Sequence, residues 1–374
     1  MPAVHHVYLV PGFFGFANLG RLRYFVHVHD VLLRRAAARR LTLRVHVVRT
    51  HPTSSLPRRA ALLLEAIADT LPRGGVAHVV GHSTGGLDAR LLAMPGVALP
   101  SRRRSEHVAA RLRSVVTIAT PHYGTPLAAA LASLRGQRLI ALLSLATSYV
   151  LRFGRLPIAA LLPIAEVFRG ATLPGKGQTL FDELSLRLLA DFSIGRRRAV
   201  QRLLARVSAD QSLLPQLTPE AMEVFNAAVR DRPGLRYGSV VTRARRPGVR
   251  STLAAGIDPA AQAVHGIYQA IYRLTADTAR GAEAPLTAAQ RDALQRAYGR
   301  VPRSHANDGI VPTRAQVWGT VIAAAQADHL DVIGHHDDPA TQPPHFDWLT
   351  TGSGFSTVAF DDVWERVLDF LVGG

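Results

Sequence analysis

The sequence VAHVVGHSTGG, residues 76–86, holds the feature that decides the fold. Residues 76–80 are nearly all apolar and predict a buried strand, whereas the residues after Gly85 predict a helix. A serine between two glycines at such a junction is the pattern of a nucleophile elbow. Side chains at Gly81 and Gly85 would collide with the neighbouring strand and helix, while the Ser83 hydroxyl would be exposed. We therefore predict Ser83 to be a nucleophile; a plain Gly-Ser turn is the alternative.

A second strand-like run, residues 6–10, leads into the glycine-rich loop PGFFG at residues 11–15. A serine nucleophile needs two backbone N–H groups directed at the oxyanion, one from the residue after the serine and one from a loop after an earlier strand. We predict these donors to be the N–H groups of Thr84 and Phe13. The alternative is a plain turn with Phe13 and Phe14 as core residues, although apolar walls beside the serine would also exclude water.

A serine hydroxyl becomes nucleophilic near pH 7 when a histidine takes its proton and a carboxylate orients that histidine. In folds that carry a nucleophile elbow, the order of these residues along the chain is serine, acid, histidine. The segments NDGIVP at 307–312 and DHLD at 328–331 follow Ser83 in that order. With these segments the chain resembles the bacterial triacylglycerol lipases of the α/β-hydrolase superfamily. The resemblance implies that Asp308 is the acid and His329 the base.

Further segments extend the resemblance over most of the chain. Residues 117–125, TIATPHYGT, resemble the strand and turn that follow the elbow in those lipases, and residues 217–226 resemble the segment before their next strand. Pro11 stands where many of them have a histidine. The resemblance implies an α/β-hydrolase fold, with a mostly parallel sheet flanked by helices and a helical cap or lid.

Other histidines and aspartates compete for the same roles. His335, His336 and His345 are alternative bases because they follow His329 closely. The alternative acids are Asp210, Asp258 and Asp277. We expect His82 and His122 to pack beside the elbow without acting in catalysis.

A calcium ion is the metal that the resemblance implies. In those lipases the acidic residue two positions after the catalytic histidine helps to bind calcium, and Asp331 matches that position. The second carboxylate is expected where this chain has Leu286, with Asp277, Glu283 and Asp292 nearby. Without a metal, Asp328 and Asp331 are expected to be solvated loop carboxylates. No zinc site and no organic cofactor is expected.

Composition narrows the class of protein. The 374 residues are 48% hydrophobic, which is sufficient for one large core, and they include no cysteine. The expected strand near residue 5 leaves no room for a signal peptide, which predicts a cytoplasmic protein, or a secreted one if the numbering starts at a mature end.

The formal charge of +17 comes from scattered arginines without interleaved aromatic residues. We expect no nucleic-acid binding; attraction to anionic lipid surfaces is the alternative.

Periodicity gives the expected organisation. Strands are predicted at 5–10, 43–49, 76–80, 114–119 and 235–242, and helices at 58–71, 86–94 and 362–372. Residues 332–357 should be irregular. The hydrolase core is expected to comprise 1–126 and 233–374, with an insertion at about 246–303, and a helical cap or lid to comprise 127–232.

Two apolar runs within the cap, 139–151 and 156–168, are shorter than the roughly 20 residues that span a bilayer, so no transmembrane segment is predicted. We expect residues 139–168 to form a lid that contacts lipid. An ordinary buried helical layer is the alternative.

These features predict a serine hydrolase that cleaves carboxylic esters, with a lipase acting on medium or long acyl chains as the main hypothesis. An acyltransferase and a short-chain or polyester-directed esterase would use the same three residues. A non-catalytic binding protein is the alternative from another class, and an incomplete triad would be its signature.

Overall fold

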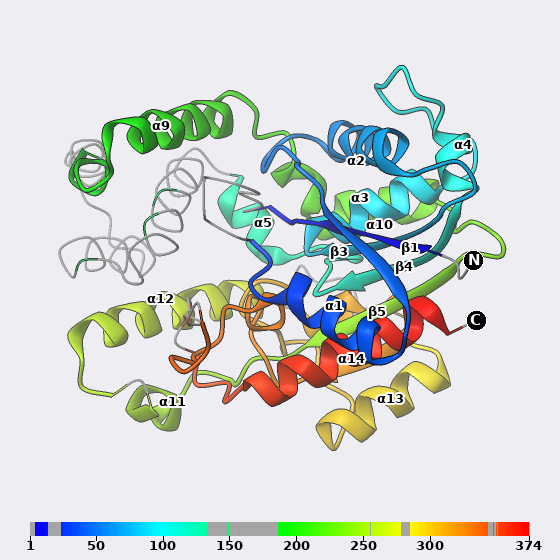
Figure 1. Cartoon of the computed structure of the whole chain (residues 1–374). Helices are drawn as coiled ribbons and strands as arrows, with labels where there is room; N and C mark the ends of the chain where they lie inside the picture. The colour runs from blue at the N-terminus through cyan, green and yellow to red at the C-terminus, as the bar shows by residue number, and fades with distance from the viewer. Residues whose placement is uncertain are drawn as a thin grey trace.

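Six parallel strands form the central sheet of the described structure (Figure 1). The computed structural model describes residues 4–13, 24–132, 145, 149, 157, 186–254, 256–277, 285–342, 347, 349 and 351–373. The strand order is β2-β1-β3-β4-β5-β6. The strands are β1 Val4–Val10, β2 Thr42–Val47, β3 Val76–His82, β4 Leu112–Ile118, β5 Arg236–Thr242 and β6 Thr320–Ala325.

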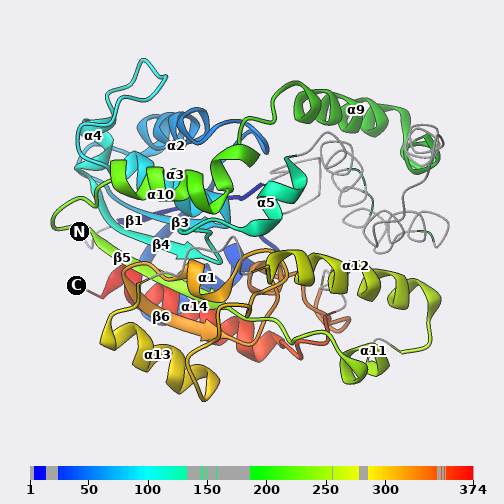
Figure 2. The same ribbon diagram turned by 180° about the vertical axis from the view of Figure 1, so that it is seen from behind.

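The helices of the described residues surround this sheet, as Figure 2 shows from the opposite side. The α-helices are α1 Val28–Ala38, α2 Leu56–Thr70, α3 Thr84–Ala93, α4 Ser105–Ala109, α5 Pro126–Leu131, α9 Ile194–Ala209, α10 Pro219–Ala228, α11 Val249–Ala254, α12 Pro259–Thr275, α13 Ala288–Tyr298 and α14 Thr357–Val372. The short 3-10 helices are η1 Leu214–Leu217, η3 Thr313–Gln316 and η4 Asp331–Ile333.

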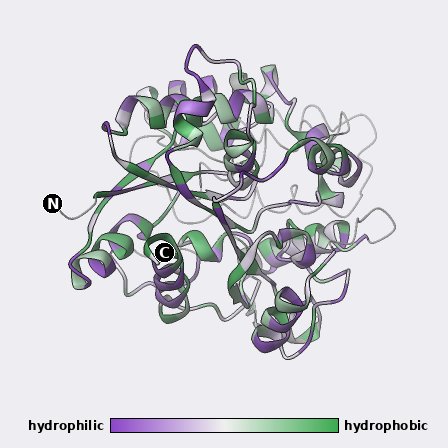
Figure 3. Cartoon of the chain, turned by 90° about the vertical axis from the view of Figure 1, so that its right-hand side faces the viewer, coloured by the Kyte–Doolittle hydropathy of each residue, from purple (hydrophilic) through white to green (hydrophobic). Residues whose placement is uncertain are grey.

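Alternate residues of the strands face two different helical layers. Val7 and Leu9 of β1 pack with buried residues of α1 and α14, whereas Tyr8 and Val10 pack with buried residues of α2 and α3. Figure 3 shows helices on both sides of the sheet, each carrying hydrophobic and hydrophilic residues. Because both faces are covered, the central strands are apolar on both sides, as parallel strands usually are.

The strands predicted from the sequence agree with β1 to β5 to within two residues at each end. The sixth strand, β6, was not predicted, because its sequence TVIAAA is half alanine and has weak strand propensity. The closing helix α14 begins at Thr357, before the predicted start at 362. The Ser356 hydroxyl caps it by accepting a hydrogen bond from the Ala359 N–H at 3.3 Å.

The predicted lid, residues 139–168, lies outside the described residues except for Leu145, Tyr149 and Pro157. Leu145 is fully buried and belongs to the same apolar cluster as residues of α5 and η1. At this position the structure agrees with the alternative of a packed layer. No helix in the described part of the chain is long and apolar enough to cross a membrane.

Candidate active site

Ser83 lies at the sharp turn between β3 and α3, with φ 53° and ψ −129°. A non-glycine residue with positive φ is strained, and such strain is concentrated at functional sites. The flanking glycines permit the turn. A Cβ on Gly81 would lie 2.3 Å from the Gly85 carbonyl oxygen, and a Cβ on Gly85 would lie 2.3 Å from the Val10 carbonyl oxygen. The turn therefore has the close approaches expected of a nucleophile elbow.

Asp308 and His329 are brought together from the two connections that flank β6. His329 Nδ1 lies 2.8 Å from Asp308 Oδ2. The same carboxylate oxygen accepts hydrogen bonds from Thr242 Oγ1 at 2.7 Å and Gln316 Nε2 at 3.1 Å. The other oxygen accepts from two backbone N–H groups of residues 310–311, at 2.9 and 2.7 Å. These hydrogen bonds hold the buried Asp308 carboxylate in a fixed orientation towards the imidazole.

The loop after β1 runs directly against the nucleophile. A Cβ on Gly12 would lie 2.5 Å from Ser83 Cβ, so a side chain there would displace the serine. Two side chains hold this loop. Arg59 Nη2 donates to the Pro11 carbonyl oxygen at 2.7 Å, and the Gly12 N–H donates to the Tyr24 hydroxyl at 3.0 Å. The loop is thus fixed beside Ser83 at two successive residues.

Arg59 also forms a buried ion pair with Asp88 of α3, with Nη2 and Oδ2 2.8 Å apart. Burial raises the pKa of Asp88 to about 6, while the positive charge of Arg59 opposes this shift. The sequence analysis did not find this pair. Both helical stretches hold other charged residues, so the sequence does not indicate which of them are buried and paired.

A single cavity joins the predicted residues: it is lined by Phe13, Ser83, Thr84 and His329. The N–H of Thr84 lies at the N-terminus of α3, where the helix dipole favours negative charge. Most other side chains of the cavity wall are aliphatic, namely those of Leu127, Ala128, Leu131, Leu214, Leu217, Ile271, Ile310, Val311 and Leu330. The Phe13 ring is buried in this wall, which agrees with the expectation of an apolar wall beside the serine.

The two competing histidines that the structure describes do not line this cavity. His335 Nε2 contacts the Tyr24 carbonyl oxygen at 3.0 Å, and His336 Nε2 lies 3.3 Å from Thr357 Oγ1. His345 lies outside the described residues. His82 and His122 are buried near the elbow.

The competing acids do not line the cavity. Asp210 pairs with Arg58, with Oδ2 and Nη1 3.1 Å apart. Asp258 and Asp277 are exposed. Among the carboxylates considered, Asp308 is the one in contact with the His329 ring.

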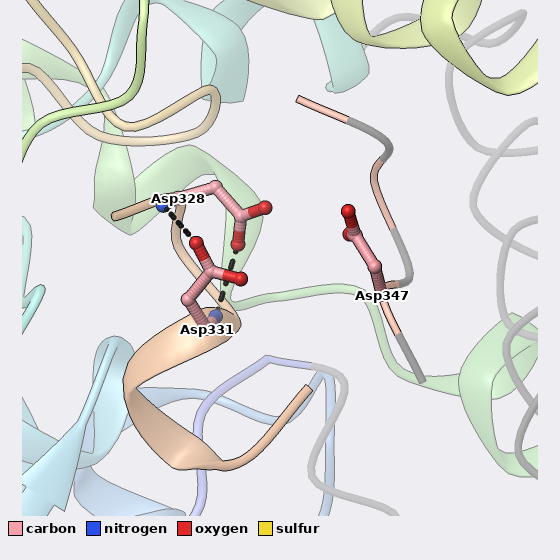
Figure 4. Close-up of side chains that lie close together, drawn as sticks. All are labelled: Asp328, Asp331 and Asp347. Atoms are coloured by element: carbon pink, nitrogen blue, oxygen red, sulfur yellow. Dashed lines mark hydrogen bonds between the residues drawn. The ribbon is translucent and has the colours of Figure 1, made fainter. Parts of the chain in front are cut away.

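Asp328 and Asp331 are not solvated loop carboxylates; that expectation was wrong, because each is only 1% exposed. Figure 4 shows that each side chain accepts a hydrogen bond from the other's backbone N–H, and that Asp347 comes from a separate segment. Carboxylate oxygens of the three residues lie within 4.8 Å of one another. Burial, together with repulsion from Asp347, raises the pKa of Asp331 to about 8.

None of the described residues that the sequence offered as the second carboxylate belongs to this group of three. Leu286 is buried in an apolar cluster, Asp277 and Asp292 are exposed, and Glu283 lies outside the described residues. Asp347 was missed because the irregular segment around it gives no periodic signal.

The sheet and the site together define the class of fold. A parallel sheet with a strained serine at the turn after one strand, an aspartate in a later connection and a histidine after the last strand is the arrangement of the α/β-hydrolase fold.

Comparison with solved structures shows the same fold. Lipase 1 from Pelosinus fermentans has a TM-score of 0.51 at 18% identity, with 98% of this chain and 99% of that chain covered. The lipase of Staphylococcus hyicus has a TM-score of 0.50 at 14% identity, with 98% and 95% covered. No protein-family model and no curated protein matches the sequence.

Proposed function

We propose that the protein hydrolyses carboxylic esters through Ser83, His329 and Asp308. The observation that carries this proposal is the 2.8 Å contact between His329 Nδ1 and Asp308 Oδ2, made by a histidine that lines the same cavity as the strained Ser83. Both of the structural neighbours described above are lipases by name, which supports the same reaction type.

In the proposed reaction, Ser83 Oγ attacks the ester carbonyl carbon while His329 takes the hydroxyl proton. Asp308 holds the Nδ1 proton of His329 and stabilises the imidazolium that forms. The N–H groups of Phe13 and Thr84 hold the oxyanion. His329 then gives its proton to the leaving alcohol, and water repeats the cycle on the acyl-enzyme. This chemistry uses no organic cofactor.

The aliphatic wall of the cavity favours an uncharged acyl chain. The side chains of Leu127, Leu131, Leu214 and Leu217 offer no hydrogen-bond partner to a polar substituent. We therefore propose medium or long acyl esters as substrates, reached by transient contact with a lipid surface. An acyltransferase or a short-chain or polyester-directed esterase would share the catalytic groups and differ in acceptor or chain length.

Hydrolysis of p-nitrophenyl esters of increasing chain length by the purified protein tests this function. We expect kcat/KM to rise from acetyl to medium or longer chains, with Ser83→Ala inactive on all of them. An added alcohol that captures most of the acyl group would favour the acyltransferase. A wild-type protein without serine-dependent hydrolysis at any length would contradict the proposal.

We also propose that Asp328, Asp331 and Asp347 hold a calcium ion. The donor set fits this cation, because calcium prefers several carboxylate oxygens and these three carboxylates repel one another when ionised. The bound ion would fix η4 and, through it, the position of His329. Calcium should raise the melting temperature of the wild-type protein and leave that of Asp331→Asn unchanged; equal responses would contradict a site here.

A further inference from the structure

A continuous chain of buried hydrogen bonds runs behind the candidate catalytic groups. The Gly12 N–H donates to the Tyr24 hydroxyl at 3.0 Å, and that hydroxyl lies 2.6 Å from His82 Nδ1. His82 Nε2 lies 2.8 Å from the carbonyl oxygen of His329. The exposed fractions of Tyr24, His82 and His329 are 7%, 0% and 3%, so water does not compete for these bonds.

The chemistry of the groups determines the direction of every bond. An amide N–H only donates, so the Tyr24 oxygen accepts from Gly12; a carbonyl only accepts, so His82 carries its proton on Nε2. Burial lowers the pKa of His82 well below its usual value, and the neighbouring His329 lowers it further. His82 is therefore neutral, and its Nδ1 accepts the Tyr24 hydroxyl proton. One arrangement of protons satisfies all three bonds.

This chain of hydrogen bonds connects the proposed oxyanion donor with the proposed catalytic base. Gly12 directly precedes Phe13, whose N–H is the proposed loop donor to the oxyanion, and His329 is the proposed base. His82 directly precedes Ser83 and contacts the backbone of His329, which leaves the His329 ring free to pair with Asp308. We propose that Tyr24 and His82 are positioning residues: they hold the loop of residues 11–13 and His329 at the separation that the reaction requires. This inference rests on the proposed function.

The neutral state of His82 also matters for the reaction. Its ring centroid lies 4.7 Å from that of His329. His329 becomes an imidazolium in each half-reaction, and a second positive ring at that distance would oppose its formation. A buried neutral histidine supplies the bridge to the His329 carbonyl without that repulsion.

Tyr24→Phe tests the positioning role with little change in shape. It removes the hydroxyl alone and leaves the Gly12 N–H and His82 Nδ1 without their partner. The control is Tyr8→Phe, because Tyr8 is also a core residue and its hydroxyl bonds to Thr70 Oγ1 at 2.9 Å, away from the site, in a part-buried hydrogen bond. Both variants lose one tyrosine hydroxyl and its side-chain hydrogen bond.

We expect Tyr24→Phe to lower kcat on a short soluble ester by about 10- to 100-fold, since small displacements of reacting groups have effects of that order. Tyr24 lines the cavity, but phenylalanine keeps its ring there, so KM should stay within about twofold. The Ki of an alkylboronic acid should rise in parallel with the loss of kcat/KM. Tyr8→Phe should lower the melting temperature without these kinetic changes. Equal kcat in the two variants would overturn the proposal.

A second pair of variants serves if Tyr24→Phe does not fold. His82→Gln offers an N–H to the His329 carbonyl and an oxygen to Tyr24, whereas His82→Met has similar length and offers neither. The glutamine variant should retain at least about ten times the kcat of the methionine variant, in line with the same positional sensitivity. Equal kcat values would refute the positioning role.

The test of the positioning role can be separated from the test of the proposed function. Nitrogen-15 NMR of the histidine rings needs no substrate and should show His82 protonated on Nε2 alone at pH 7; a proton on Nδ1 would refute the chain of bonds. If Ser83→Ala retains hydrolysis, the proposed function fails. If hydrolysis depends on Ser83 but kcat is unchanged in Tyr24→Phe, only the positioning inference fails.

Discussion

Asp308→Asn should separate activity from stability more sharply than other changes at the site. Asparagine keeps the shape of the side chain and one carbonyl oxygen, which can still accept from the two backbone N–H groups of residues 310–311. Its NH₂ group then faces Thr242, Gln316 and His329, which all donate to Asp308 Oδ2 in the wild-type protein.

The structure indicates how each donor would respond. Thr242 Oγ1 can donate instead to Gln316 Oε1, at 3.0 Å, and accept from the new NH₂ group. Gln316 Nε2 has the carbonyl oxygens of Thr242 and Val311 within 3.2 and 3.3 Å. Because these partners remain, we expect the free energy of unfolding to fall by only roughly 1–3 kcal/mol, the cost of lost charge-assisted hydrogen bonds.

His329 has no such alternative. To accept from the NH₂ group its Nδ1 must lose its proton, which places the proton on Nε2, the nitrogen that should receive the Ser83 proton. The loss in kcat should therefore be of order 10⁴, as for the same change in another serine triad. Ester hydrolysis and urea unfolding of the variant measure the two effects, with Asp277→Asn as an exposed control. A loss below tenfold, or an inactive control, would refute the assignment.

Two further predictions concern the buried framework. Burial, with smaller contributions from His5 and nearby arginines, lowers the pKa of His78 to about 3. As the pH falls, the unfolded chain therefore binds a proton at this histidine before the folded protein does. The stability that comes from this difference is fully present above pH 6.5 and should be lost towards pH 3, at up to about 1.4 kcal/mol per pH unit. Urea unfolding at pH 7, 6 and 5 should show a shallower pH dependence in His78→Gln, and an unchanged slope would contradict this. Leu145→Ser should destabilise the protein by roughly 2–5 kcal/mol, because it opens a cavity in the apolar cluster that includes residues of α5 and η1. Activity should fall equally on short esters and on emulsified long esters. A loss on the long esters alone, at unchanged melting temperature, would instead support a lipid-facing lid.

The features that were predictable from the sequence are those with a local signal. Apolar runs located β1 to β5, and the glycines around Ser83 revealed the elbow because the turn is impossible with larger residues. Asp308 and His329 were located by their order in the chain and by resemblance, and the structure places them in contact. Their relation to Ser83 in catalysis stays a prediction.

Features that depend on long-range packing gave no such signal. Tyr24 and His82 are 58 residues apart, and Arg59 and Asp88 are 29 apart. Nothing in either local sequence indicates a buried partner. The burial of Asp331 was missed for the same reason, since a loop carboxylate is exposed unless the fold covers it.

Covalent labelling tests the central claim most directly. An alkyl fluorophosphonate reacts with a serine that is activated by a histidine and flanked by oxyanion donors, whatever the natural ester. Mass spectrometry of the treated protein should find one adduct, on Ser83, formed in proportion to the loss of ester hydrolysis and absent in Ser83→Ala. An adduct on another residue, or hydrolysis that persists when Ser83 is fully labelled, would contradict the account.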